Sequence, residues 1–238
     1  MKILALEFSS AQRGVAVVEA VPAASSRRPD ATSATDGDCK SPALGARVLG
    51  LAEAEGLAPG PFELIGSALR SAGIEREQIE CIAVGLGPGS YTGVRSAIAL
   101  AQGWQLALGV KLLGIGSAEV LAATAQTAGL TGRVAVVIDA LRGEFYSASY
   151  EIKANDWREV APLRLLTRAA VEALAAAGEL LVSPDVKCPF AGAKFLPPSA
   201  GELGRLAALR TDFQPGEKLE PIYLRETTFV KAPPPRFY

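Results

Sequence analysis

Two stretches that lie far apart in the chain repeat one pattern, and this repeat constrains the fold more than any other feature. "ILALEFSSAQRGVAVVEA" near the N-terminus has an apolar run, the acidic Glu7, an Arg-Gly pair and a second apolar run. "VAVVIDALRGEFYSASYE", residues 134–151, has Asp139 and Arg142 in comparable places. Apolar runs joined by turn residues are typical of paired strands. The repeat predicts an α/β protein with two lobes, each begun by a β-hairpin.

The segments outside the hairpins carry helix and strand patterns. "PFELIGSALRSAG" predicts a helix that begins at Pro61 and ends before Gly73, because its apolar residues recur at helical spacing. Three later helices are expected to begin at hydroxyl N-caps, namely Ser117, Thr167 and Ser199. Further strands are expected at residues 47–52, 79–85 and 111–115.

The same patterns predict the domain boundaries. We expect an N-terminal lobe over residues 1–109, a C-terminal lobe over residues 110–222, and a terminal segment with a frayed tail over residues 223–238. Residues 22–42, "PAASSRRPDATSATDGDCKSP", are rich in Ser, Ala, Asp and Pro and have no hydrophobic period. Such a composition predicts a disordered insertion in the first lobe.

Composition excludes several classes of function. The chain has 238 residues, 49% of them hydrophobic, which is enough for a sizeable core. The 24 basic and 25 acidic residues leave no excess positive charge for gripping nucleic acid unaided. Histidine is absent, and the three cysteines are widely spaced, so neither a histidine base nor a zinc site is expected. With no apolar stretch long enough to span a membrane and no signal peptide, we expect a cytoplasmic protein.

The glycine-rich stretch "GLGPGSYTGVR", residues 85–95, raises the question of phosphate binding. A P-loop requires a lysine, and this stretch has none. A dinucleotide fingerprint requires a last glycine where this chain has Thr92. The stretch therefore predicts a sharp strand-to-helix corner with Ser90 or Thr92 as the N-cap. We assign this structural role to Gly87, Pro88, Gly89, Ser90, Thr92 and Gly93.

The helix that follows this corner has two unusual features. Arg95 falls in its first turn, where the helix dipole disfavours a cation by roughly 0.3–1 kcal/mol, so a specific anionic partner is expected. Residues 96–110, "SAIALAQGWQLALGV", carry no charge, and apolar residues cover nearly the whole circumference. One side should face the sheet. The other side either packs on the helix that begins at Pro61 or joins it in an apolar patch for another chain.

At this point a family resemblance adds to the residue patterns. "GLGPGSYTGVRSAIALAQGWQLALGVKLLGIGS", together with "ILALEFSS", "VIDALRGEFYSASYE" and "EPIYLRETTFVK", resembles the TsaB (YeaZ) family of bacterial tRNA threonylcarbamoyladenosine biosynthesis proteins. The resemblance implies the actin-like ATPase fold (hexokinase/Hsp70/actin, ribonuclease H-like). It also implies a non-catalytic subunit that stabilises and activates a TsaD-type threonylcarbamoyltransferase, which modifies an adenosine next to the tRNA anticodon.

The resemblance further implies a set of partners. These are a TsaD-type subunit and a TsaE-type ATPase, with tRNA contacted only through the complex, and with ATP and metal bound by the partner subunits and none by this chain. In relatives, the two helices of the first lobe form the interface, and the same helices are expected to support a homodimer. The residues implied as the interface are Phe62, Ile65, Leu69, Ala72, Val94, Arg95, Ile98, Ala101, Gln102 and Gln105.

The chain departs from this family in ways that bear on its chemistry. Glu7 stands where many members have Asp, which weakens any phosphate or metal role of the first hairpin, and the histidine that often precedes the first helix is absent. Two other functions remain as alternatives: a free-standing ATPase or kinase of the same fold, and a glycoprotease-like hydrolase. For the hydrolase, Asp139 and Glu144 are the candidate acid/base pair, although a carboxylate at a strand end more often fixes a turn.

Overall fold

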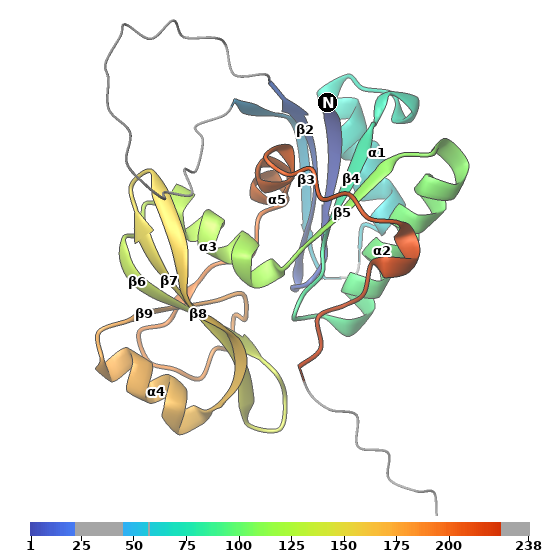
Figure 1. Cartoon of the computed structure of the whole chain (residues 1–238). Helices are drawn as coiled ribbons and strands as arrows, with labels where there is room; N and C mark the ends of the chain where they lie inside the picture. The colour runs from blue at the N-terminus through green and yellow to red at the C-terminus, as the bar shows by residue number, and fades with distance from the viewer. Residues whose placement is uncertain (22–44, 57, 225–238) are drawn as a thin grey trace, which may run out of the picture.

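The computed structural model describes residues 1–21, 45–56 and 58–224. The expected insertion at residues 22–42 and all but the first two residues of the expected segment 223–238 lie outside the described residues. Figure 1 shows two lobes, each built on one sheet. Each sheet has five strands, in the orders β3-β2-β1-β4-β5 and β10-β9-β6-β7-β8. The expected two-lobed α/β architecture is confirmed.

The first sheet starts with the expected hairpin. β1 pairs with β2 in antiparallel register from Lys2 opposite Glu19 to Glu7 opposite Gly14. On its other side β1 pairs in parallel with β4, and β4 pairs in parallel with β5. Alternate residues of β1 supply the two faces, because side chains in a strand point to opposite sides in turn. The strands are β1 (Lys2–Glu7), β2 (Gln12–Ala20), β3 (Ala46–Glu55), β4 (Cys81–Gly85) and β5 (Lys111–Ile115).

The second sheet repeats this arrangement. Its hairpin places β6 antiparallel to β7, with Asp139 opposite Phe145, and β6 pairs in parallel with β9. The two hairpins therefore occupy corresponding positions in their sheets, as the repeated sequence pattern predicts. The strands are β6 (Gly132–Asp139), β7 (Glu144–Lys153), β8 (Asp156–Thr167), β9 (Leu180–Ser183) and β10 (Lys194–Phe195).

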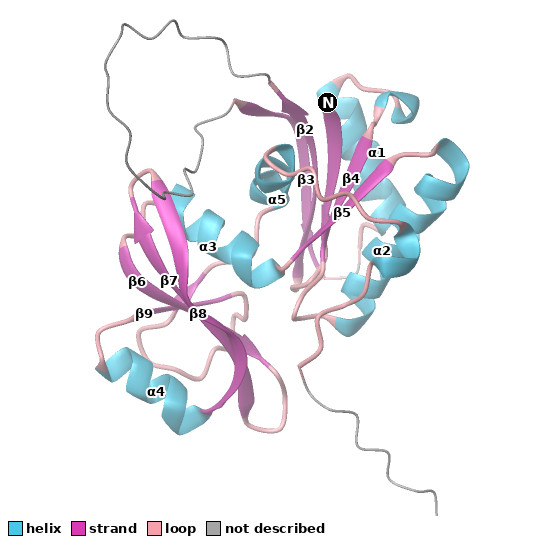
Figure 2. Ribbon diagram, in the orientation of Figure 1, coloured by secondary structure: helices cyan, strands magenta, loops and turns pink. Residues whose placement is uncertain are grey.

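Figure 2 shows that helices pack against both sheets. Helices α1 (Pro61–Ala72) and α2 (Tyr91–Leu108) share one hydrophobic cluster with the first sheet, and α5 (Ala200–Ala208) packs on its opposite face. Helix α4 (Arg168–Ala176) covers the outer face of the second sheet. Two short 3-10 helices, η1 (Arg76–Gln78) and η2 (Gly216–Lys218), complete the described secondary structure. No helix among the described residues has both the length and the hydropathy that a membrane span requires.

Helix α3 (Ser117–Thr127) lies between the two lobes. Its Val120 belongs to the core cluster of the first lobe, whereas Leu121 and Ala122 belong to that of the second lobe. A helix that is apolar nearly all round is stable only when it is covered on several sides. Small alanines on α3 allow both lobes to approach it closely.

The expected boundary between residues 109 and 110 is wrong. β5 lies beyond that boundary, yet it pairs with β4 in the first sheet, where Leu112 and Leu113 are fully buried on opposite faces. Helix α5 also returns from the second lobe to pack on β1 and β2. A parallel strand buried on both faces reads as a continuous apolar run, so the run itself does not say which sheet it joins.

The expected caps are mostly confirmed. Gly73 ends α1, and the side chains of Thr167 and Ser199 accept hydrogen bonds from the backbone N–H groups of Ala170 (3.4 Å) and Glu202 (3.5 Å). Ser117 is the exception: the N-cap of α3 is Gly116, and the Ser117 hydroxyl has another role.

Candidate functional site

The glycine-proline loop joins β4 to α2 and packs directly against the first hairpin. The Ser90 backbone N–H donates a hydrogen bond to the Ser9 carbonyl oxygen (2.6 Å). A Cβ at Gly89 would overlap that carbonyl oxygen, and a Cβ at Gly93 would overlap the carbonyl oxygen of Phe8. Ser90 caps α2, since its hydroxyl accepts from the Gly93 N–H (3.2 Å). The loop is thus the strand-to-helix corner that the sequence predicts, and its glycines allow close backbone contact.

Behind this loop, Glu7 is wholly buried at the end of β1. Its carboxylate accepts a hydrogen bond from the Ser9 N–H (2.9 Å) and from the Ser117 hydroxyl (3.1 and 3.2 Å). The Ser117 oxygen in turn accepts from the Gly87 N–H (3.1 Å). Burial raises the pKa of Glu7, against the opposing effect of its hydrogen bonds to Ser9 and Ser117. Glu7 therefore braces the loop from inside the lobe.

The implied interface residues fall into different environments. Ile65, Val94, Ile98 and Ala101 are buried in the core cluster between α1, α2 and the first sheet. They do not form an exposed patch in this chain, which corrects the expectation that they present a surface to a partner. The covered side of α2 therefore packs on α1 and the sheet, which is one of the two arrangements that the sequence permits.

Gln102 and Gln105 are occupied within the chain. We call residues 210–224 the C-terminal strap, which follows α5 and runs across the first lobe to α2 (Figure 1). The Gln102 amide donates to the Gly216 carbonyl oxygen (2.8 Å), and the Gly216 N–H donates to the Gln105 side-chain oxygen (2.8 Å). These two glutamines fasten the strap to α2.

Arg95 has aromatic neighbours where an anionic partner was expected. Its guanidinium carbon lies 4.3 Å from the centre of the Tyr91 ring, and Tyr91 stacks on Tyr223 of the strap at 5.8 Å. A side-chain hydrogen bond with Tyr223 raises the pKa of Arg95. Among the described residues no carboxylate forms an ion pair with Arg95, and the expected anionic partner stays a prediction. The ring face supplies the favourable contact for the cation.

The exposed faces of α1 and α2 are a different set from the implied one. On α2, Ala99, Gly103 and Leu106 are exposed at helical spacing, and Leu106 is 90% exposed. On α1, Phe62 is 73% exposed. We call these four residues together with Leu69 the outer helix surface.

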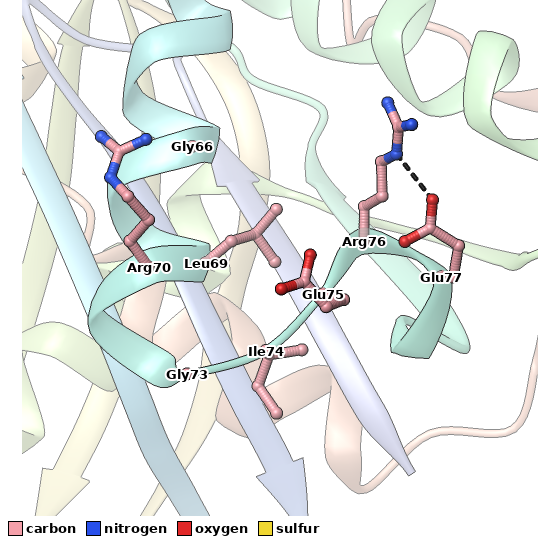
Figure 3. A pocket seen from close by; sticks show the side chains of 8 residues that line it. All are labelled: Gly66, Leu69, Arg70, Gly73, Ile74, Glu75, Arg76 and Glu77. Atoms are coloured by element: carbon pink, nitrogen blue, oxygen red, sulfur yellow. Dashed lines mark hydrogen bonds and ion pairs between the residues drawn. The ribbon is translucent and has the colours of Figure 1, made fainter.

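A hollow of about 590 Å³ lies at the C-terminal end of α1. Figure 3 shows Leu69 and Ile74 beside each other, with Glu75 close by and the ion pair of Arg76 with Glu77 (2.7 Å) at the far side. Leu69 and Ala72 are half-buried and pack against the core. The residues that line the hollow are Gly66, Leu69, Arg70, Gly73, Ile74, Glu75, Arg76 and Glu77.

A larger cavity of about 680 Å³ lies between the lobes. The first hairpin, the start of α2 and the turn of the second hairpin line it, and its charged lining residues are Arg13, Asp139 and Asp185. Sequence reasoning missed Arg13 and Asp185 as cavity residues, because only the lobe arrangement brings them to one space. Glu7 is not among the lining residues, since its carboxylate faces Gly85 inside the lobe.

Asp139 holds the turn of the second hairpin. Its carboxylate accepts from the Leu141 N–H (2.7 Å), and its own N–H donates to the Asp185 carboxylate (2.9 Å). Leu141 and Arg142 both have left-handed backbone conformations (φ 62° and 57°), which such a turn needs. Burial raises the pKa of Asp185, and its hydrogen bond with the Asp139 backbone opposes this. These contacts favour the turn-fixing role of Asp139 over an acid/base role with Glu144.

The family model described as "TsaD: tRNA N6-adenosine threonylcarbamoyltransferase" matches residues 62–195. The tRNA threonylcarbamoyladenosine biosynthesis protein TsaB of Escherichia coli is 35% identical over 92 residues, covering 39% of this chain and 40% of that protein. The Bacillus subtilis TsaB is 32% identical over 98 residues, covering 41% and 42%. These matches span about two fifths of the length of either relative.

Two further comparisons cover more of the chain. Uncharacterized protein Rv3421c of Mycobacterium tuberculosis is 33% identical over 179 residues, covering 73% of this chain and 75% of that protein. The structure described as "YeaZ from Pseudomonas aeruginosa" superposes with a TM-score of 0.69 at 25% identity, covering 94% of this chain and 99% of that one. The paired hairpin-led lobes define an α/β protein of the actin-like ATPase (ribonuclease H-like) fold. Within that fold, the chain belongs to the TsaB (YeaZ) family.

Proposed function

We propose that this chain is a non-catalytic subunit in the synthesis of threonylcarbamoyladenosine in tRNA, and that it binds, stabilises and activates a TsaD-type threonylcarbamoyltransferase. The observation that carries the proposal is the outer helix surface. A helix face turned to water normally carries charged residues. The exposed face of α2 has Ala99, Gly103 and Leu106 instead.

Small side chains on this face suit helix packing. An added Cβ at Gly103 would meet nothing within 4 Å, so the space over this residue is open. Helices whose facing residues are small can approach to interaxial distances of about 8 Å. Leu106, which follows Gly103 on α2, is large and exposed, and so is Phe62 on α1. These two side chains are the anchors that a partner helix would cover.

The hollow at the end of α1 gives this surface a polar border. Leu69 and Ile74 supply apolar area there, and Arg70, Glu75 and Arg76 supply charges of both signs at its edge. An apolar centre with a charged rim is the usual composition of a specific interface between proteins. We therefore assign the partner contact to the outer helix surface and the adjoining hollow, in place of the buried residues.

Two carboxylates at equivalent strand ends support the non-catalytic part of the proposal. Glu7 braces the glycine-proline loop through Ser9 and Ser117, and Asp139 fixes the turn after β6 through Leu141. Both groups already have structural partners, and the chain has no histidine to act as a base. We propose that ATP and metal are bound by the partner subunits, a TsaE-type ATPase among them. The near-neutral net charge of −1 favours tRNA contact through the complex.

Co-expression with the TsaD homologue of the same organism tests the proposal. The wild-type chain should elute with that homologue in size-exclusion chromatography as a stable heterodimer. Ala99→Arg or Gly103→Arg should prevent co-elution, because a charged side chain would be buried against the partner without a counter-ion.

The matched control is Ala169→Arg, the same kind of substitution on an exposed helix position of the second lobe. It should leave co-elution unchanged. Co-elution that survives both α2 variants would contradict the assigned surface, and a wild-type chain that never co-elutes would contradict the partner itself.

A further inference from the structure

Arg95 is the one charged residue in the sequence of helix α2, and its side chain is exposed. Among the described residues no carboxylate forms an ion pair with its guanidinium. The residue also stands near the N-terminus of the helix, where the positive end of the helix dipole disfavours a cation. The described part of the chain thus places a cation here without supplying its anion.

Two tyrosines hold the Arg95 side chain in place. The guanidinium carbon lies 4.3 Å from the centre of the Tyr91 ring, and the guanidinium forms a side-chain hydrogen bond with Tyr223. The two rings stack on each other with their centres 5.8 Å apart. A guanidinium has more N–H donors than one phenol oxygen can accept, so donors remain for an anion. The side chain is therefore positioned before a partner arrives, which lowers the entropy cost of binding.

A second arginine in the chain has the same setting and a counter-ion of its own. Arg168, the first residue of α4, lies over the Phe190 ring at 5.8 Å. Its Nε donates to the Glu172 carboxylate, four residues later on the same helix (2.9 Å). The residue four positions after Arg95 is Ala99, whose side chain has no acceptor. The chain completes the ion pair on α4, whereas on α2 it keeps the equivalent position small.

Arg95 lies on the side of α2 that carries the outer helix surface. At about 100° of rotation per residue, Ala99, Gly103 and Leu106 all fall within about 80° of Arg95 around the helix axis. Leu106 lies about 16 Å further along that axis. Arg95 does not line the cavity between the lobes. A partner helix that covers Ala99 and Gly103 would therefore pass beside the guanidinium.

We propose that Arg95 binds the carboxylate of an aspartate or glutamate on the partner chain that covers the outer helix surface. This inference rests on the proposed function, which assigns that surface to a TsaD-type subunit. Burial of small and apolar side chains has little directionality, so Ala99 and Gly103 alone permit several registers of a partner helix. One ion pair at the end of an uncharged face favours a single register. The planar guanidinium can donate two parallel N–H bonds to a carboxylate, which adds geometric specificity.

Binding of the full chain to the purified TsaD homologue of the same organism, measured by biolayer interferometry, tests this assignment. Arg95→Met keeps an unbranched apolar side chain beside Tyr91 without the charge, and should weaken affinity about tenfold at about 50 mM salt. Arg95→Glu sets one carboxylate against another, and should weaken affinity about a hundredfold. Both losses should become at least about threefold smaller near 1 M salt, because salt screens exposed charges.

Arg168→Met is the matched control, since it removes an exposed arginine from an aromatic ring on the second lobe. It should change affinity less than about twofold. A wild-type chain that does not bind the homologue would contradict the proposed function and this assignment with it. Wild-type binding that both Arg95 variants leave unchanged would overturn this assignment alone, and so would losses that are the same at both salt concentrations.

Two further measurements cover the remaining outcomes. Wild-type affinity that does not depend on salt would overturn the assignment even where an Arg95 variant fails to fold. Glu226, which lies outside the described residues, is the first acidic residue after Tyr223 in the sequence. Recovery of wild-type affinity when Glu226→Arg is added to Arg95→Glu would place the carboxylate in this chain, and would also overturn the assignment.

Discussion

The Ser117 hydroxyl donates to both carboxylate oxygens of Glu7, at 3.1 and 3.2 Å, although 110 residues separate the two. Glu7 ends β1, and Ser117 is the first residue of α3, the helix that both lobes share. The Gly87 N–H donates to the same Ser117 oxygen, so the contact also holds the glycine-proline loop. One buried carboxylate thereby links the first hairpin, the loop before α2 and the helix between the lobes.

Glu7→Gln should change how stability depends on pH. Burial raises the pKa of Glu7 in the folded state, so the folded chain holds this proton more tightly than the unfolded chain. The resulting stability is complete below the ordinary carboxyl pKa of about 4.3 and is lost as pH rises through the raised pKa. Wild type should therefore lose stability as pH rises, whereas Glu7→Gln has no carboxyl group to titrate at this position. In urea titrations between pH 4 and pH 8, the difference in free energy of unfolding, variant minus wild type, should increase with pH.

Glu77→Gln is the control for this measurement. Its hydrogen bond from Arg76 lowers the pKa of Glu77, but the carboxylate is exposed, so the stability difference from wild type should be nearly constant over the same range. A Glu7→Gln difference that decreases with pH would contradict the assigned direction.

Ile65→Asp and Leu69→Asp should separate the core of α1 from its surface. Ile65 is 5% exposed, so an aspartate there should reduce the free energy of unfolding by about 3–5 kcal/mol. Leu69 is half-buried beside the hollow, so Leu69→Asp should cost about 1–2 kcal/mol and remain folded. Circular dichroism melts measure both. Equal losses in the two variants would contradict the different burial of these positions.

Three glycine-to-alanine variants should differ in the sign of their effect on the free energy of unfolding. Gly89→Ala and Gly93→Ala each place a Cβ against a backbone carbonyl oxygen of the first hairpin, and should destabilise the chain by about 2 kcal/mol or more. Gly103→Ala meets open space inside α2, and should stabilise it by about 0.5–1 kcal/mol. Urea unfolding of all three gives the comparison. A neutral Gly89→Ala would show that the loop does not need this close contact.

Self-association should use the outer helix surface when the partner is absent. Exposed apolar residues such as Phe62 and Leu106 favour burial against a second copy. Sedimentation should show a weak, concentration-dependent dimer for wild type, and Leu106→Lys should shift it to monomer. Val186→Lys alters another exposed apolar residue, on the second lobe, and should leave the dimer unchanged. A dimer that persists in Leu106→Lys would place self-association elsewhere.

Local patterns in the sequence were sufficient to predict most of the individual helices and strands. Helix α1 begins at Pro61 and ends at Ala72 before Gly73 as predicted, since a proline start, helical spacing and a glycine stop are all contained within the segment. Ser90 caps α2 for the same reason: the donor and the acceptor lie three residues apart. The two hairpins follow from apolar runs separated by short turns, and their repetition was enough to predict two similar lobes.

Long-range packing decided the remaining features, because the same residue pattern permits more than one neighbour. Ser117 has the sequence position of an N-cap, but its hydroxyl donates a hydrogen bond to the Glu7 carboxylate, which is distant in the sequence. The apolar circumference of α2 did not reveal which side meets the sheet, which side holds the strap and which stays exposed. Arg13 and Asp185 are unremarkable in the sequence and share a cavity only because the lobes face each other. Burial and charge pairing depend on three-dimensional neighbours, and these positions are defined by contacts that no short segment contains.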